Sequence, residues 1–97
     1  MSTLSNEEIE EKLSGLEGWI RADAKTIERN FSFPAFMQGI SFVEQTAQHA
    51  EEVNHHPHIT IDHTSVTIRL STLDAGGITM KDIDSASQYN RIFDSLS

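Results

Sequence analysis

The hydrophobic and polar positions of the chain predict helices and strands in alternation. The first helix is expected to start at Ser5, which fits a capping box with Glu8 in the motif Ser-x-x-Glu. Apolar residues then recur at helical spacing along one face, and two glycines mark the end of the helix. The residues that define this helix are Leu4, Ile9, Leu13, Gly15, Leu16 and Gly18.

Two short strands are expected next, over residues 19–23 and 26–31. In the second strand Ile27, Arg29 and Phe31 alternate with Thr and other polar residues. Such alternation is typical of a strand with one face toward the core.

The longest predicted helix starts around Pro34, which a first turn accepts because its missing N–H is not needed there. Apolar residues then recur at spacings of 3, 4, 3, 4 and 3. This stripe is expected to face the core, an interpretation that we favour over a cofactor-binding or membrane helix. The stripe consists of Phe33, Phe36, Ile40, Val43, Ala47 and Ala50.

A β-hairpin is the clearest strand signal in the second half of the chain. Two runs of alternating residues meet near residues 64–65, where the turn is expected. The alternation places His63 on the inner face, as a packed and hydrogen-bonded imidazole. The inward positions of the two strands are Ile59, Ile61, His63, Val66, Ile68 and Leu70.

A last helix is expected to start between Thr79 and Asp82, after glycines 76 and 77 break the strand pattern. Hairpins pair antiparallel, and striped helices need an apolar face to cover. We therefore predict an α+β domain over residues 1–97, in the order α-β-β-α-β-β-α, with a four-stranded antiparallel sheet and three helices packed on one face. The stripe of the last helix is Ile83, Ala86, Tyr89 or Asn90, Phe93 and Leu96.

Length and composition limit which partners and which cellular compartment we expect for this protein. A chain of 97 residues can bury one small core, so oligomerisation would cover leftover apolar surface. The net charge of −8 and the scattered basic residues argue against binding nucleic acid. No apolar run approaches the roughly 20 residues that span a bilayer, and no signal peptide is apparent. With no cysteine for disulfides or thiolate sites, we expect a cytoplasmic protein.

The segment from Glu51 to His58 carries the candidate chemistry. Histidine has an ordinary pKa of about 6.5, so it exchanges protons near neutral pH. His55 and His56 stand between a helix end and Pro57, which keeps His56 out of helical geometry. Such junctions hold side chains rigidly while leaving them accessible.

Other interpretations of this histidine turn remain open. A histidine near a helix C-terminus is also favoured by the helix dipole alone. A metal site has enough donors, but the spacing matches no known His or Cys/His pattern, so no metal is expected. No Gly-x-Ser-x-Gly motif supports a serine nucleophile. General acid–base catalysis by imidazole is therefore the favoured chemistry.

The motif Glu51-x-x-x-His55-His56-Pro57 is followed by the strand of residues 66–72, by Gly-Ile-Thr at 77–79 and by Asp82. This combination resembles the pterin-4a-carbinolamine dehydratase family over most of the chain. The resemblance implies a lyase (a hydro-lyase) that dehydrates 4a-hydroxytetrahydropterin to quinonoid dihydropterin and recycles the cofactor of aromatic amino-acid hydroxylases. It implies no metal and no organic cofactor, and assembly as a homodimer or homotetramer.

The resemblance also assigns roles to residues. His55 and His56 correspond to two adjacent catalytic histidines, with His56 leading in acid–base chemistry and His55 orienting the pterin. Glu51 and Asp82 correspond to supporting positions that orient the site or cap a helix. The positions expected to contact substrate are Asn54, Pro57, Ser71, Thr72, Leu73 and Asp74.

One position departs from the family's pattern. A third histidine usually follows the Ser-Thr pair, and here that position is Leu73, which cannot transfer a proton. We therefore expect activity below that of family members with three histidines, and His58, His63 or Asp74 are candidates to compensate. The alternative is a catalytically weakened pterin-binding or dimerisation scaffold.

Overall fold

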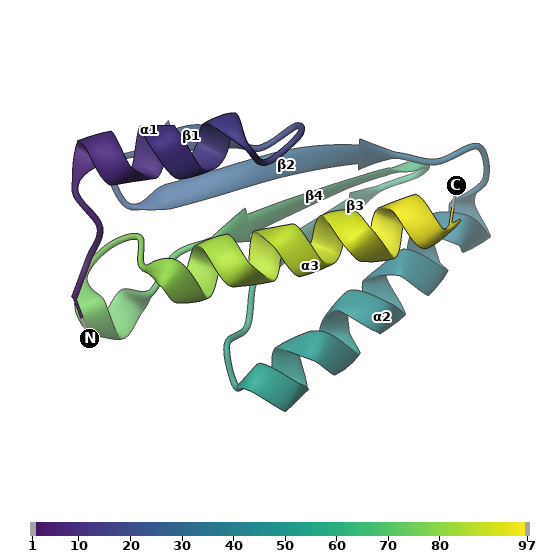
Figure 1. Ribbon diagram of the computed structural model, residues 1–97. Coiled ribbons are helices and arrows are strands. Elements are labelled where there is room, and N and C mark those ends of the chain that lie inside the picture. The colour runs from purple at the N-terminus through teal and green to yellow at the C-terminus, as the bar shows by residue number, and fades with distance from the viewer. Residues whose placement is uncertain (1, 97) are drawn as a thin grey trace.

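The computed structural model describes residues 2–96 as a sheet covered by helices (Figure 1). The predicted α+β class and the order α-β-β-α-β-β-α are confirmed, with one additional 3-10 turn, η1. The elements are α1 (Asn6–Ser14), β1 (Ile20–Asp23), β2 (Thr26–Ser32), α2 (Phe36–Val53), β3 (His58–Asp62), β4 (Ser65–Leu70), η1 (Leu73–Ala75) and α3 (Met80–Leu96).

The four strands pair antiparallel in the order β1-β2-β4-β3, so β2 and β4 are central and β1 and β3 are edges. Ile27 pairs with Leu70 and Phe31 with Val66, which sets the inner rows of the central strands in register. The apolar inner positions of β2 and β4 are buried as predicted, whereas Arg29 on the same row of β2 is half-buried. The opposite face of the sheet is polar and more open to solvent.

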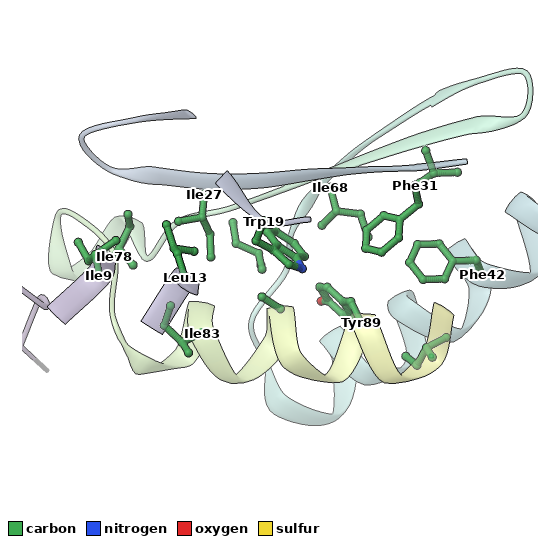
Figure 2. Packing of buried hydrophobic residues seen from close by; sticks show 14 of the residues in the cluster. Ile9, Leu13, Trp19, Ile27, Phe31, Phe42, Ile68, Ile78, Ile83 and Tyr89 are labelled. Atoms are coloured by element: carbon green, nitrogen blue, oxygen red, sulfur yellow. The ribbon is translucent and has the colours of Figure 1, made fainter. Parts of the chain in front are cut away.

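One hydrophobic core lies between the inner face of the sheet and the helices (Figure 2). α1 contributes Ile9 and Leu13, and α3 contributes Ile83 and Tyr89, all of them buried. The predicted capping box of α1 is present: the Glu8 backbone N–H donates to Ser5 Oγ at 3.1 Å, and Glu8 accepts from the Ser5 backbone N–H. Within residues 2–96, no helix is both long and apolar enough to cross a membrane.

The face that α2 turns to the core differs from the predicted one. The helix buries Gly39, Phe42, Thr46 and Ala50, whereas Phe36 is 45% exposed. The core face is thus rotated by about one residue from the predicted stripe, because apolar residues occupy two neighbouring faces of this helix. The other members of the predicted stripe divide as follows: Phe33 and Ala50 are buried, Ile40 and Val43 are half-buried, and Ala47 is exposed.

The prediction for His63 is also wrong. His63 and Thr64 form the hairpin turn, and His63 adopts a positive φ of 53° on the surface. Its ring stacks on Phe36 with centroids 6.4 Å apart. β3 therefore ends at Asp62, and because β3 is an edge strand, Ile61 stays 42% exposed. α2 begins at Phe36, so Pro34 precedes the first turn.

Candidate active site

The end of α2 fixes the directions of the two adjacent histidines. Asn54 caps the helix in the left-handed conformation (φ 52°, ψ 45°), which asparagine tolerates better than most residues. The backbone N–H of His55 returns to the carbonyl of Ala50 at 3.0 Å. Pro57 then leads into β3, so both imidazoles are held at a helix-to-strand junction.

His55 is held by a buried carboxylate. Its Nε2 lies 2.7 Å from Oδ1 of Asp82, whose side chain is completely buried, while the His55 side chain is 10% exposed. An ionised carboxylate only accepts hydrogen bonds, so Nε2 must carry the proton. This contact fixes the tautomer of His55 and leaves its Nδ1 as the free ring nitrogen.

The second oxygen of Asp82 is satisfied by two further donors. Oδ2 accepts from the hydroxyl of Thr72 at 2.7 Å and from the backbone N–H of Thr79 at 3.0 Å. Asp82 lies in the first turn of α3, where the helix dipole favours negative charge. Three hydrogen bonds and the helix end therefore compensate the cost of burying this carboxylate.

His56 is far more accessible than His55. Its side chain is 56% exposed, and its Nε2 pairs with Oε2 of Glu51, which is itself 75% exposed. An exposed pair of this kind contributes little to stability. The pair instead orients the imidazole ring of His56, so that Nδ1 is the ring nitrogen left for a ligand.

Two neighbouring pockets that share three lining residues form the two lobes of a cleft beside these histidines. The smaller lobe, of about 170 Å³, is lined by Asn54, His55, His56, Ser71, Thr72, Leu73, Asp74 and Lys81. The larger lobe, of about 430 Å³, is lined by Thr26, His56, Pro57, His58, Arg69, Leu70, Ser71 and Leu73. His56, Ser71 and Leu73 line both lobes and so mark their junction.

The structure brings together every site residue predicted from the sequence. The two histidines predicted to be catalytic and all six predicted substrate-contact positions line the cleft. Glu51 and Asp82 lie behind the lining and hold His56 and His55 respectively. Thr72 also contacts Asp82, so it supports the site as well as lining it. Leu73, at the start of η1, is 87% exposed beside both lobes.

Four residues that line the cleft were not predicted from the sequence: Thr26, Arg69, Leu70 and Lys81. A fifth, His58, was considered only as a substitute for the missing third histidine. Strand alternation could have placed Arg69 and His58 on the outward face of the sheet. Their proximity depends on strand register, which the sequence does not show. His63, the other histidine considered as a substitute, lies on the hairpin turn away from the cleft lining.

The arrangement suits proton transfer to a bound molecule. Two imidazoles approach the same small lobe, one fixed by a buried carboxylate and one exposed at the mouth. Histidine at such a position can act as a general acid or base. Within residues 2–96, no three His, Asp or Glu side chains are grouped as a metal-binding set.

Comparisons with known proteins identify the family. The sequence model described as pterin 4 alpha carbinolamine dehydratase matches residues 2–92. A Mycolicibacterium smegmatis protein, provisionally named a pterin-4-alpha-carbinolamine dehydratase, is 46% identical over 92 residues, covering 95% of this chain and 97% of that protein. A Roseiflexus protein with the same provisional name is 46% identical over 89 residues, covering 92% and 95%.

Solved structures agree with this assignment. A transcriptional coactivator/pterin dehydratase from Brucella melitensis superposes with a TM-score of 0.90 at 34% identity, covering 94% of this chain and 98% of that one. A pterin dehydratase-like protein identified as a RuBisCO assembly factor shares the fold, with a TM-score of 0.67 at 22% identity, over 79% and 90% of the two chains. Because the family model and these relatives span nearly the whole chain, this protein belongs to the pterin 4 alpha carbinolamine dehydratase family.

Proposed function

We propose that this protein is a hydro-lyase that converts 4a-hydroxytetrahydropterin into quinonoid dihydropterin and water by acid–base catalysis at His55 and His56. The observation that carries the proposal is the fixed His55–Asp82 pair beside an accessible second imidazole in one cleft. Family membership and the resemblance of the histidine motif support the substrate class.

The reaction needs only proton transfers. The C4a–O bond breaks with its electron pair on oxygen, and a proton from an imidazolium completes the departing water. Loss of the proton on ring nitrogen N5 leaves its electron pair to form the C4a=N5 double bond. One proton is given and one is taken, so the site is regenerated without an oxidant, and we propose that it needs no metal or organic cofactor.

The two histidines differ in the roles that their surroundings favour. His56 is accessible and paired with an exposed carboxylate, so it can exchange protons with both substrate and solvent. We assign it the leading acid–base role. His55 is nearly buried and locked by Asp82, which suits it to orient the pterin and receive a hydrogen bond at Nδ1. Ser71, Thr72 and Asp74 complete the lining of the small lobe.

Replacement of His56 tests the assignment. His56→Ala is expected to lower kcat/KM for carbinolamine dehydration by about 10²- to 10⁴-fold, the usual contribution of a positioned acid–base group. His63→Ala is the matched control, because this imidazole is exposed on the hairpin turn and outside the cleft lining. Equal rates for both variants would contradict the proposal. Thermal unfolding of each variant shows that the comparison is made between folded proteins.

A second candidate function is a pterin-binding or dimerisation scaffold with little catalysis. The observation in its favour is Leu73, which lines both lobes where a third proton-transferring side chain is expected from the resemblance. The related Brucella protein is described as both a coactivator and a dehydratase. A wild-type protein that binds reduced pterin without accelerating dehydration would favour the scaffold.

The proposed biological setting is tetrahydropterin recycling in the cytoplasm, linked to an aromatic amino-acid hydroxylase and carried out by a homodimer or homotetramer. Apolar side chains that the core leaves uncovered support the assembly: Phe36 is 45% and Met37 66% exposed on α2, and Ile61 is 42% exposed on the edge strand β3. Sedimentation equilibrium of the wild type would measure the assembly. A monomer at micromolar concentration would contradict this part of the proposal.

A further inference from the structure

We propose that Thr79 is a positioning residue for the dehydration reaction. Thr79 lies outside the cleft lining, but its hydroxyl belongs to a buried chain of hydrogen bonds that leads to Asp82 and so to His55. The inference rests on the proposed function only for the catalytic task of His55. The hydrogen-bond chain itself can be tested without turnover.

The ionised carboxylate at the end of the chain fixes the direction of each hydrogen bond in it. Asp82 can only accept, so the hydroxyl of Thr72 donates to its Oδ2 at 2.7 Å. A hydroxyl has one proton, and Thr72 has thereby used its own. In the 2.8 Å contact between the two threonine hydroxyls, Thr79 must therefore be the donor. Oγ1 of Thr79 accepts in turn from the backbone N–H of Lys81 at 3.2 Å.

The three side chains that form this chain are buried: Thr72 is 6%, Thr79 1% and Asp82 0% exposed. Water is a poor substitute partner at such positions, so a hydrogen bond left unmade costs more here than on the surface. Hydrogen bonds in series also polarise one another, so the donation from Thr79 strengthens the bond from Thr72 to the carboxylate. The acceptor that fixes Nε2–H of His55 therefore depends on a hydroxyl two hydrogen bonds away.

The start of α3 explains why these groups meet. Thr79 directly precedes the helix, and its carbonyl accepts from the backbone N–H of Asp82 at 3.1 Å. The backbone N–H of Thr79 donates in return to the Asp82 side chain at 3.0 Å, which is the reciprocal arrangement of a capping box. Thr72 is held at the same place by its backbone bridge to Gly77. Asp82 therefore belongs both to a helix cap and to the support of His55.

Replacing Thr79 by valine keeps the branched shape of the side chain and removes the hydroxyl. In Thr79→Val, kcat/KM for carbinolamine dehydration should fall about twofold to tenfold, as the net loss of one neutral hydrogen bond gives. The Nε2–H proton of His55, followed by heteronuclear NMR, should exchange with water faster by a similar factor, because its acceptor is held less firmly. Thr79→Ser keeps the hydroxyl and should bring both values back toward those of the wild type.

Loss of a helix cap must be separated from this effect. Ser5→Ala is the matched control, because it removes the hydroxyl that caps α1 through the backbone N–H of Glu8. Either variant should raise the equilibrium constant of unfolding by about 2- to 30-fold, the usual result of losing such a cap. Only Thr79→Val should change kcat/KM and the exchange at His55. Thr79→Gly is the second variant should valine prevent folding, because glycine costs little at a cap.

The inference is overturned if Thr79→Val matches Ser5→Ala in kcat/KM, because Thr79 would then be a helix cap only. It is also overturned if Thr79→Ser is impaired as much as Thr79→Val, because the hydroxyl would not be the cause. A wild type that does not accelerate dehydration contradicts the proposed function instead. The exchange measurements then decide alone: faster exchange at His55 in Thr79→Val but not in Ser5→Ala supports the positioning role, and equal exchange in the two variants refutes it.

Discussion

Replacing Asp82 by asparagine should separate the support of His55 from the shape of the site. The amide has nearly the size of the carboxylate, so the packing of this completely buried side chain is preserved. One amide oxygen can still accept from Thr72 and from the Thr79 backbone, as Oδ2 does in the native protein. The remaining NH₂ group then faces Nε2 of His55, which itself carries a proton, so two donors oppose each other.

The expected cost follows from the hydrogen bond that is lost. A hydrogen bond to a charged group contributes about 1.5–3 kcal/mol, and Asp82→Asn should lower the free energy of unfolding by about that amount. His55 must turn away or move its proton to Nδ1, which changes the nitrogen presented to the cleft from acceptor to donor. If the whole effect is felt in the transition state, kcat/KM falls by about 10- to 150-fold, since each 1.4 kcal/mol is a factor of ten.

Steady-state dehydration kinetics and urea unfolding of the same preparations measure both effects. Asp84→Asn is the matched control, because it removes an exposed carboxylate two positions further along α3. If Asp82→Asn matches this control in kcat/KM and in stability, Asp82 does not position His55 for catalysis. A loss of stability with unchanged kcat/KM would make Asp82 a structural group only.

Three further perturbations test other parts of the molecule. Leu73→His should raise kcat, because it adds an imidazole at the junction of the lobes; no gain in rate would remove Leu73 as the cause of weakened activity. Gly18→Ala should cost about 1–3 kcal/mol of stability, because φ is +80° and the new Cβ would lie 2.4 Å from Nε of Arg29. Gly76→Ala, at a φ of +79° with nothing within 4 Å of the new Cβ, should lose less stability when both variants are unfolded in urea. Equal losses of stability would show that the clash with Arg29 is not the cause. Burial raises the pKa of Tyr89 from 10.0 to about 12, so the free energy of unfolding should fall as pH rises from about 10 to 12. In Tyr89→Phe this fall should be smaller when unfolding is measured across the same alkaline range. An equal fall in both proteins would contradict an origin in Tyr89.

The sequence predicts the elements of the fold well, but not which face of α2 is buried. Spacings of three and four fit Phe36 and Ile40 as well as Phe42 and Thr46. Gly39 favours the second face, because its missing side chain lets Phe33 and Val66 approach to 3.4 Å of where a Cβ would stand. Thr46 can be buried there because its hydroxyl donates to the Val43 carbonyl at 2.8 Å. Packing against the sheet therefore selects the face, and periodicity alone does not.

The candidate site is likewise predictable from the sequence only in its local features. Local signals identify the histidine turn, since a helix end and a proline are visible along the chain. The contact between His55 and Asp82 joins residues 27 positions apart and depends on how α3 approaches the end of α2. The strand register similarly brings His58 of β3 and Glu28 of β2 to either side of Arg69 of β4. Motifs thus predict which residues are present, whereas the tertiary contacts determine which of them act together.

The catalytic claim is tested most directly by following the disappearance of a 4a-hydroxytetrahydropterin in the presence and absence of the wild-type protein. Two fixed imidazoles beside the ring should make the decay faster than the spontaneous reaction, in proportion to protein concentration, with quinonoid dihydropterin as the product. Decay at the protein-free rate, from protein shown to be folded and able to bind reduced pterin, would contradict the account.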